Sequence, residues 1–183
     1  MLFPVNTRIA WTNSILDTLS RLDQPCVEYL RSHRTKIRFN RQSISTGAIW
    51  FIDGNIYLNT RYYSTQTMHN DPHLLSLIVH EVCHLQQGFF TALSVYGELE
   101  AWQLGFRVYQ SLTGHLPLGR GENPHAALLE IMSLPLGWDR QVLRRAQILM
   151  QEYAGKGYRA DLLPLYPLRK EIRHRLNLNS PKA

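Results

Sequence analysis

The stretch of this sequence with the clearest chemical content is LIVHEVCHLQQG, residues 77 to 88. It holds His80 and His84, four residues apart, with Glu81 directly after the first histidine. On an α-helix this spacing separates two side chains by one turn and only about 40° around the axis, so both imidazoles can converge on one ion. Neutral imidazole is a good zinc ligand, and a neighbouring carboxylate that does not bind the metal can take a proton from an attacking water. The pattern predicts a zinc site with His80 and His84 as ligands and Glu81 as general base. The alternative is a helix that carries two solvated or hydrogen-bonded histidines.

The helix that carries this motif is predicted to begin at Asp71-Pro72 and to end near Gly88. Aspartate is a good N-cap, proline suits the first helical position, and glycine is common just after a helix end. The apolar side of the helix, expected to face the core, consists of Leu74, Leu75, Ile78, Val79, Val82, Cys83 and Leu85. Cys83 is therefore interpreted as a small buried residue. The opposite side carries His73, His80, Glu81, His84 and Gln87.

A catalytic zinc typically takes three protein ligands, and the next predicted helix, residues 92 to 112, offers two carboxylates. Glu98 lies near the centre of its apolar arc, whereas Glu100 lies on the opposite side. That polar side carries Glu100, Gln103, Arg107 and Ser111. A carboxylate in a core-facing stripe is costly unless it meets a cation, so Glu98 is the predicted third ligand. The small residues Ala101 and Gly105 would let the two helices approach closely. An arginine partner is the alternative for Glu98, and Glu100 is interpreted as a surface charge.

HEVCH at residues 80 to 84, followed by ELEAW at residues 98 to 102, resembles the gluzincin group of zinc metallopeptidases, which includes the thermolysin-like enzymes. The second motif is similar to the E-x-x-A-D of the CAAX prenyl protease branch. The resemblance extends over residues 47 to 112. It implies that His80, His84 and Glu98 bind one zinc ion and that Glu81 is the general base. It also implies that the hairpin before the helix belongs to a small sheet whose edge strand aligns peptide substrates.

Trp102 departs from this family pattern, because it stands where the family has an acid that orients a histidine ligand. Either support for the ligands comes from elsewhere, or zinc affinity or activity is lower than in the family. HEVCH also resembles the SprT-like proteases that act on DNA-bound proteins. Those proteases use a third histidine soon after the motif, and the nearest later histidine here is His115. A donor for the oxyanion is expected as well, and the sequence leaves open Tyr62, Tyr63, His69, His73 and His115.

Length and composition indicate one ordinary globular domain. A chain of 183 residues with 44% hydrophobic and 19% charged residues suits a single domain. The resemblance implies that residues 1–183 form one zincin-like metallopeptidase domain. No apolar run reaches the roughly 18 residues of a membrane helix, and no secretory signal is recognised. The two cysteines, Cys26 and Cys83, suit a reducing interior. We therefore expect a cytoplasmic protein that does not associate with membranes.

The remaining elements predict an α+β fold that is mostly helical, with a small antiparallel sheet or hairpin before the active-site helix. AIWFIDGNIYLNT places two β-type runs around Asp53-Gly54, a strong hairpin dipeptide. Residues 8 to 33 predict one or two helices with a break near Gln24-Pro25. Further helix boundaries are expected at Gly114, Asn123-Pro124, Asp139 and Gly155, with a last short helix in the tail.

The net charge is +6, and basic residues gather in two clusters. The first holds Arg31, Arg34, Lys36, Arg38 and Arg41, and the second holds Arg169, Lys170, Arg173 and Arg175. Such clusters are usually solvated surface, although they can face nucleic acid. Three functions therefore compete: a zinc-dependent peptidase with a peptide or protein substrate, a zincin-like zinc-binding protein without peptidase activity, and a nucleic-acid-associated basic protein.

Overall fold

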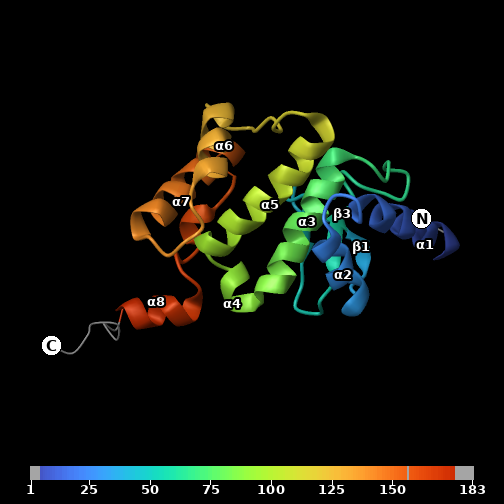
Figure 1. The fold of residues 1–183 in the computed structure, drawn as a ribbon, viewed down its shortest axis with the longest axis horizontal. Helices are drawn as coiled ribbons and strands as arrows, with labels where there is room; N and C mark the ends of the chain where they lie inside the picture. Colours follow the sequence, from blue (N-terminus) through green and yellow to red (C-terminus); the bar gives the residue numbers. More distant parts are fainter. Residues whose placement is uncertain (1–4, 156, 176–183) are drawn as a thin grey trace. The chain divides into compact units, whose positions relative to one another are not determined.

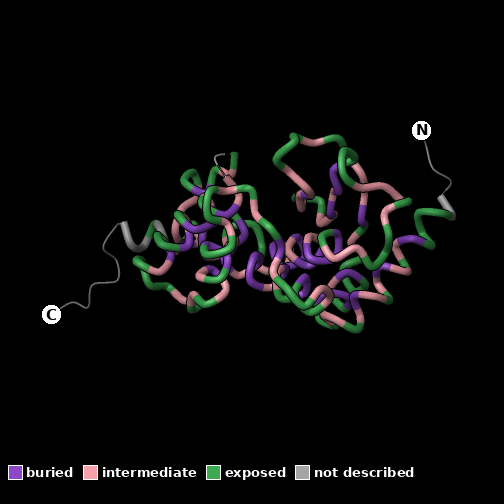
Figure 2. Tube along the Cα trace, turned by 90° about the horizontal axis from the view of Figure 1, so that it is seen from above, coloured by how far each residue is buried: buried purple, intermediate pink, exposed green. Residues whose placement is uncertain are grey.

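The computed structural model describes residues 5–155 and 157–175 of the chain. Helices dominate and a small three-stranded sheet accompanies them, so the predicted α+β class is confirmed (Figure 1). The described residues divide into two compact units. The first holds residues 5–86 and 104–117, and the second holds residues 87–103, 118–155 and 157–175. In each unit the buried positions gather in the interior (Figure 2). In the part of the chain that is described, no helix has the length and apolar character needed to cross a membrane.

The first unit contains the N-terminal helices α1 (Val5–Leu19) and α2 (Gln24–Ser32). Asp23 caps α2, because its carboxylate accepts a hydrogen bond from the backbone N–H of Cys26 at 3.0 Å. Pro25 lies in the first turn of α2, where its missing N–H does no harm. The predicted break near Gln24-Pro25 is therefore the start of a second helix.

The sheet of the first unit has the strand order β1-β3-β2, with β1 (Ile37–Asn40), β2 (Ala48–Trp50) and β3 (Ile56–Asn59). Strands β2 and β3 form the predicted antiparallel hairpin, and Gly54 has the positive φ of 74° that favours glycine in its turn. Strand β1 runs parallel to β3, so the expectation of a purely antiparallel sheet is wrong. A parallel partner joins through a crossover and not through a tight turn, so no local signal marks it.

Asn59, at the end of β3, forms hydrogen bonds with the loop that connects β1 and β2. Its buried amide nitrogen donates to the carbonyl oxygens of Ser43 at 2.8 Å and Thr46 at 2.6 Å. Its side-chain oxygen accepts from the backbone N–H groups of Gln42 at 3.2 Å and Arg61 at 3.1 Å. These bonds satisfy the loop backbone and hold β2 at the edge of the sheet.

Helix α3 (Pro72–Gln87) carries the HEVCH motif and begins and ends as predicted. The Asp71 carboxylate accepts from the N–H of Leu74 at 2.8 Å, and Gly88 follows the helix with a φ of 73°. The predicted core side is confirmed, since Leu85 is partly buried and the other six residues are buried: Leu74, Leu75, Ile78, Val79, Val82 and Cys83.

Helix α5 (Val95–Thr113) continues from the second unit into the first, and Gly114 ends it with a φ of 77°. Within the first unit its backbone approaches α3 closely at Gly105. A Cβ at this position would lie 2.9 Å from the carbonyl oxygen of Ser76 and 3.5 Å from the Cβ of His80. The absent side chain thus permits the close packing that the small residue predicts.

The second unit contains the remaining helices: α4 (Phe89–Ala92), α6 (Pro124–Ser133), α7 (Arg140–Ala154), the 3-10 helix η1 (Ala160–Leu162) and α8 (Leu168–Arg175). Asp139 caps α7, because its carboxylate accepts from the N–H groups of Gln141 at 2.7 Å and Val142 at 3.0 Å. Gly155 ends α7 with a φ of 84°, and Pro124 begins α6. The local cap and stop signals therefore predicted these helix boundaries correctly.

Candidate metal centre

Helix α3 brings the two histidine side chains of the HEVCH motif together. The Nε2 atoms of His80 and His84 lie 3.0 Å apart, and the rings meet edge to face with centroids 4.6 Å apart. Two nitrogen ligands of one tetrahedral zinc lie roughly 3.3 Å apart, given bonds of about 2.0–2.1 Å, so this spacing suits a shared cation. The same distance suits a hydrogen bond between the rings. A third ligand is needed to distinguish the two interpretations.

Glu98 is that third residue. The ligand atoms of His80, His84 and Glu98 all lie within 4.8 Å of one another, and no other set of at least three His, Cys, Asp or Glu residues in the described chain gathers in this way. His84 is buried, and His80 and Glu98 are half-buried. Two imidazoles and one carboxylate are a donor set that zinc takes in hydrolytic enzymes. The residues present therefore fit a zinc ion, and a group able to hold a metal is formed by the three residues predicted for it.

The carboxylate of Glu98 is held by two side chains of the second unit. Its Oε2 accepts hydrogen bonds from the Trp102 indole N–H at 3.1 Å and from the Tyr158 hydroxyl at 2.6 Å. Trp102 stands where the family pattern has an acid, and its side chain contacts Glu98. The sequence gives no sign of Tyr158, because it lies 60 residues after Glu98 and no motif surrounds it.

Glu81 lies against the edge strand β2 within the first unit. Its side chain is only 4% exposed, and its Oε2 accepts from the backbone N–H of Trp50 at 2.8 Å. The Trp50 ring lies 6.2 Å from that of His84, measured between centroids. The motif side of α3 was expected to lie opposite the core, yet Glu81 and His84 are both buried. The reason is that the end of β2 packs on this side of the helix, and the helical pattern of α3 contains no information about that strand.

The direction of the β2 backbone explains how Trp50 reaches Glu81. Residues Gly47 and Phe51 pair with β3 and its turn through the bonds Asn59 N to Gly47 O at 2.8 Å and Phe51 N to Asn55 O at 3.0 Å. In an antiparallel pair these bonded positions alternate, so Ile49 also faces β3. Ala48 and Trp50 then direct their N–H and C=O groups to the outer side. Glu81 therefore lies at the outer edge of the sheet.

The polar side of α5 differs from its prediction at Gln103. Glu100 is half-buried and accepts a hydrogen bond from the Gln87 amide at 2.9 Å. Gln103 is buried, and its amide nitrogen donates to the carbonyl oxygens of Ile131 and Leu134, each at 2.8 Å. The expectation of a solvent-facing Gln103 is wrong because the last carbonyl groups of α6 need donors, and this amide supplies them.

Four of the five candidates for an oxyanion donor make other contacts in the first unit: Tyr62, Tyr63, His73 and His115. Tyr62 donates its hydroxyl to the carbonyl oxygen of Ile44. Burial raises the pKa of Tyr63 to about 12. His73 and His115 pack against the ring of Tyr109, with centroid distances of 4.8 Å and 5.9 Å. None of these contacts involves a member of the candidate ligand group, so the oxyanion donor stays a prediction without an assigned residue.

The two basic clusters differ in their surroundings. In the first cluster four side chains are exposed: Arg31, Arg34, Lys36 and Arg41. In the second, Arg169 lies over the Phe90 ring at 5.8 Å and Lys170 over the Trp138 ring at 3.6 Å. These contacts are compatible with a solvated surface, and nucleic-acid binding stays a prediction.

Comparisons with models of known protein families, with curated proteins and with solved structures found no match to this chain. The gluzincin resemblance stays a prediction carried by two short motifs.

Proposed function

We propose that this protein is a zinc-dependent metallopeptidase of the zincin-like type, in which His80, His84 and Glu98 hold one zinc ion and Glu81 is the general base. The observation that carries the proposal is the gathering of the three ligand atoms within 4.8 Å of one another. Zinc bound by such a donor set lowers the pKa of a water molecule toward neutrality and polarises a substrate carbonyl. Three protein ligands also leave one position for water or substrate.

Glu81 has the position and the support that a general base requires. It follows His80 directly on α3 and is not one of the three gathered groups. Its hydrogen-bond partner Trp50 has its ring 6.2 Å from that of His84, measured between centroids. The N–H of Trp50 holds its Oε2 at 2.8 Å and thereby restricts the rotation of the carboxylate. In the proposed reaction Glu81 takes a proton from the attacking water and later delivers it to the leaving amine.

The edge strand β2 supports an extended peptide as the substrate. Ala48 directs its backbone N–H and C=O groups to the outer side of β2, where a peptide can add as a further strand. Because the Trp50 N–H bonds Glu81, a peptide aligned on this edge would pass the general base. This geometry favours a peptidase over a protein in which zinc only stabilises the fold.

The test is a zinc determination by elemental mass spectrometry, followed by an assay of protein hydrolysis. The wild type and Glu100→Gln should each contain about one zinc per chain, whereas Glu98→Gln should contain clearly less. Glu100 is the matched control, since it lies two residues away on the same helix and bonds Gln87.

Hydrolysis of unfolded casein should stop after chelation and return when zinc is added. A wild type that binds no zinc even after reconstitution would refute the proposal. Zinc without hydrolysis of any unfolded substrate would instead favour the zinc-binding protein without peptidase activity.

A further inference from the structure

Two side chains of the second unit donate hydrogen bonds to one carboxylate oxygen of Glu98, Oε2. Oε2 accepts from the Tyr158 hydroxyl at 2.6 Å and from the Trp102 indole N–H at 3.1 Å, and the same indole N–H also donates to the Tyr158 oxygen at 3.2 Å. A carboxylate oxygen has two lone-pair positions, so these two donors satisfy Oε2.

Trp102 is a rigid donor. It lies one turn after Glu98 on α5 and is buried. Its ring packs against Tyr153, with centroids 5.4 Å apart, and against Tyr158, with centroids 5.1 Å apart. Packing of this kind fixes the direction of the indole N–H, so the bond to Glu98 does not depend on a mobile side chain.

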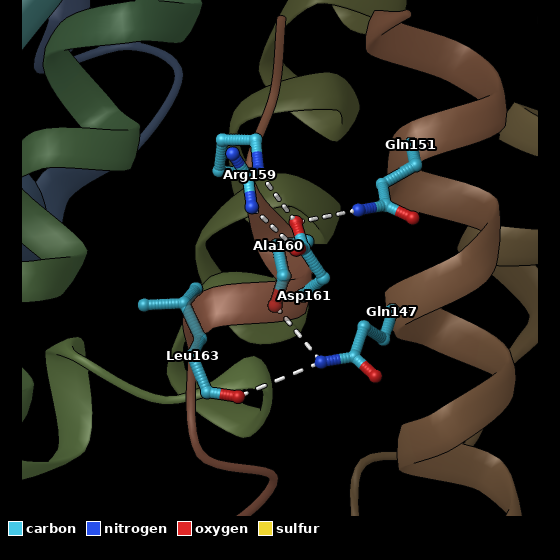
Figure 3. Close-up of polar contacts among 6 residues, drawn as sticks. All are labelled: Gln147, Gln151, Arg159, Ala160, Asp161 and Leu163. Carbon is cyan, nitrogen blue, oxygen red and sulfur yellow. Dashed lines mark hydrogen bonds and ion pairs between the residues drawn. The ribbon is translucent and has the colours of Figure 1, made fainter. Parts of the chain in front are cut away.

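The segment that follows Tyr158 is hydrogen-bonded to α7. Gln147 donates its amide to the carbonyl oxygen of Ala160 at 2.9 Å, and Gln151 donates to the Asp161 carboxylate at 2.9 Å (Figure 3). Figure 3 shows both glutamines on one helix, directed at the turn of η1. These bonds restrict the chain immediately after the tyrosine.

The same segment also caps the beginning of α5. The backbone N–H groups of Val95 and Tyr96 donate to the carbonyl oxygens of Pro164 at 2.9 Å and Leu165 at 3.2 Å. These are N–H groups of the first helical turn, which have no partner inside the helix. Hydrogen bonds to α7 and to the start of α5 thus hold residues 158 to 165 in place. In this position the Tyr158 hydroxyl reaches Glu98 in the first turn of α5.

From this geometry we infer that Tyr158 and Trp102 are positioning residues that fix the carboxylate of Glu98 in its orientation as a metal ligand. The inference rests on the proposed function, because it assumes that Glu98 binds the metal. It also gives Trp102 a role: the family's acid orients a histidine, whereas this tryptophan orients the carboxylate. Removal of such an outer partner typically lowers metal affinity 10- to 100-fold.

The experiment measures the dissociation constant for zinc by competition with a chelating dye, starting from metal-free full-length protein. Tyr158→Phe should bind zinc about 10- to 100-fold more weakly than the wild type, and Trp102→Phe should weaken binding in the same direction. Because the hydroxyl acts through the carboxylate, Tyr158→Phe should cause no further loss in a Glu98→Gln background. Tyr57→Phe is the matched control, since it removes a tyrosine–carboxylate bond of 2.7 Å to Asp53 on the sheet of the first unit.

The outcomes separate this inference from the proposed function. A wild type that binds zinc, together with Tyr158→Phe and Trp102→Phe that bind it within about twofold of wild type, would overturn the positioning role and leave the proposed function standing. A further loss of equal size in the Glu98→Gln background would also overturn it, because the tyrosine would then act on the fold and not on the ligand. A wild type without zinc would overturn both. Thermal melting of the metal-free proteins identifies a variant that fails to fold, and the other variant then decides the result.

Discussion

Replacing Glu81 by glutamine should abolish peptide hydrolysis while zinc and fold remain. The glutamine keeps a side-chain oxygen that can accept the Trp50 N–H, which now donates to Glu81 at 2.8 Å. It cannot take up a proton, and loss of a general base lowers rates by roughly 10²- to 10⁴-fold. Zinc content should stay at the wild-type value, because Glu81 is not among the three gathered ligand residues.

Glu81→Ala separates the structural contribution of this residue from its chemistry. Glu81 is 4% exposed and Trp50 is half-buried, so alanine removes the acceptor of the Trp50 N–H at a largely buried position. An unsatisfied buried donor destabilises a protein by about 1–3 kcal/mol. For a chain of this size each kcal/mol lowers Tm by roughly 2–4 °C, so Tm should fall by roughly 2–12 °C. Glu81→Gln should melt close to the wild type.

The assay combines the turnover of an unfolded peptide substrate with zinc determination and thermal melting on the same preparations. Turnover by Glu81→Gln within tenfold of the wild type would refute the role of Glu81 as general base. Equal melting temperatures for Glu81→Ala and Glu81→Gln would refute the argument that the bond from Trp50 supports the fold at this position.

Two further predictions concern the packing of α3 with α5 and the stability of the first unit in alkali. Gly105→Ala should weaken zinc binding several-fold even though alanine favours helix by about 1 kcal/mol, because its Cβ would lie 2.9 Å from the carbonyl oxygen of Ser76 and force α5 away. Gly137→Ala, with no atom within 4 Å of the added Cβ, is its control, and equal zinc affinity of both variants would contradict the close approach. Tyr63 has a pKa raised to about 12 by burial, whereas an unfolded tyrosine ionises near pH 10. The neutral Tyr63 side chain contributes its full stabilisation below pH 10, and this contribution is lost as the pH rises through 12. The free energy of unfolding measured in urea should therefore fall less between pH 9 and pH 11 in Tyr63→Phe than in the wild type. An equal loss in both proteins would rule out this role for Tyr63.

The elements that the sequence predicted well are those with local signals. Asp71 and Asp139 accept hydrogen bonds from the first turns of their helices, and Gly114 and Gly155 end helices with a positive φ. Each signal acts within three residues of the place that it marks, so it can be read without knowledge of the rest of the chain.

The features that could not be predicted from the sequence depend on contacts between residues that are far apart along the chain. Strand β1 pairs with β3 across a register of Ile37 with Ile56, and Asn59 is buried because it holds the loop between β1 and β2. Gln103 falls on the polar side of a helical wheel, yet it bonds Ile131 and is buried. Polarity predicts exposure only where no other element needs a donor or acceptor at that position.

By itself the sequence determined the members of the candidate metal group. Helical spacing makes His80 and His84 converge, and the apolar arc of α5 selects Glu98 and not Glu100, because a carboxylate in that arc needs a cation or a donor. Only the tertiary structure decided which groups orient these carboxylates. The hydroxyl of Tyr158 reaches Glu98 over 60 residues of chain, and the N–H of Trp50 reaches Glu81 over 31. Contacts over such separations arise from the packing of segments whose own sequences carry no mark of the partner, so periodicity and spacing could not reveal them.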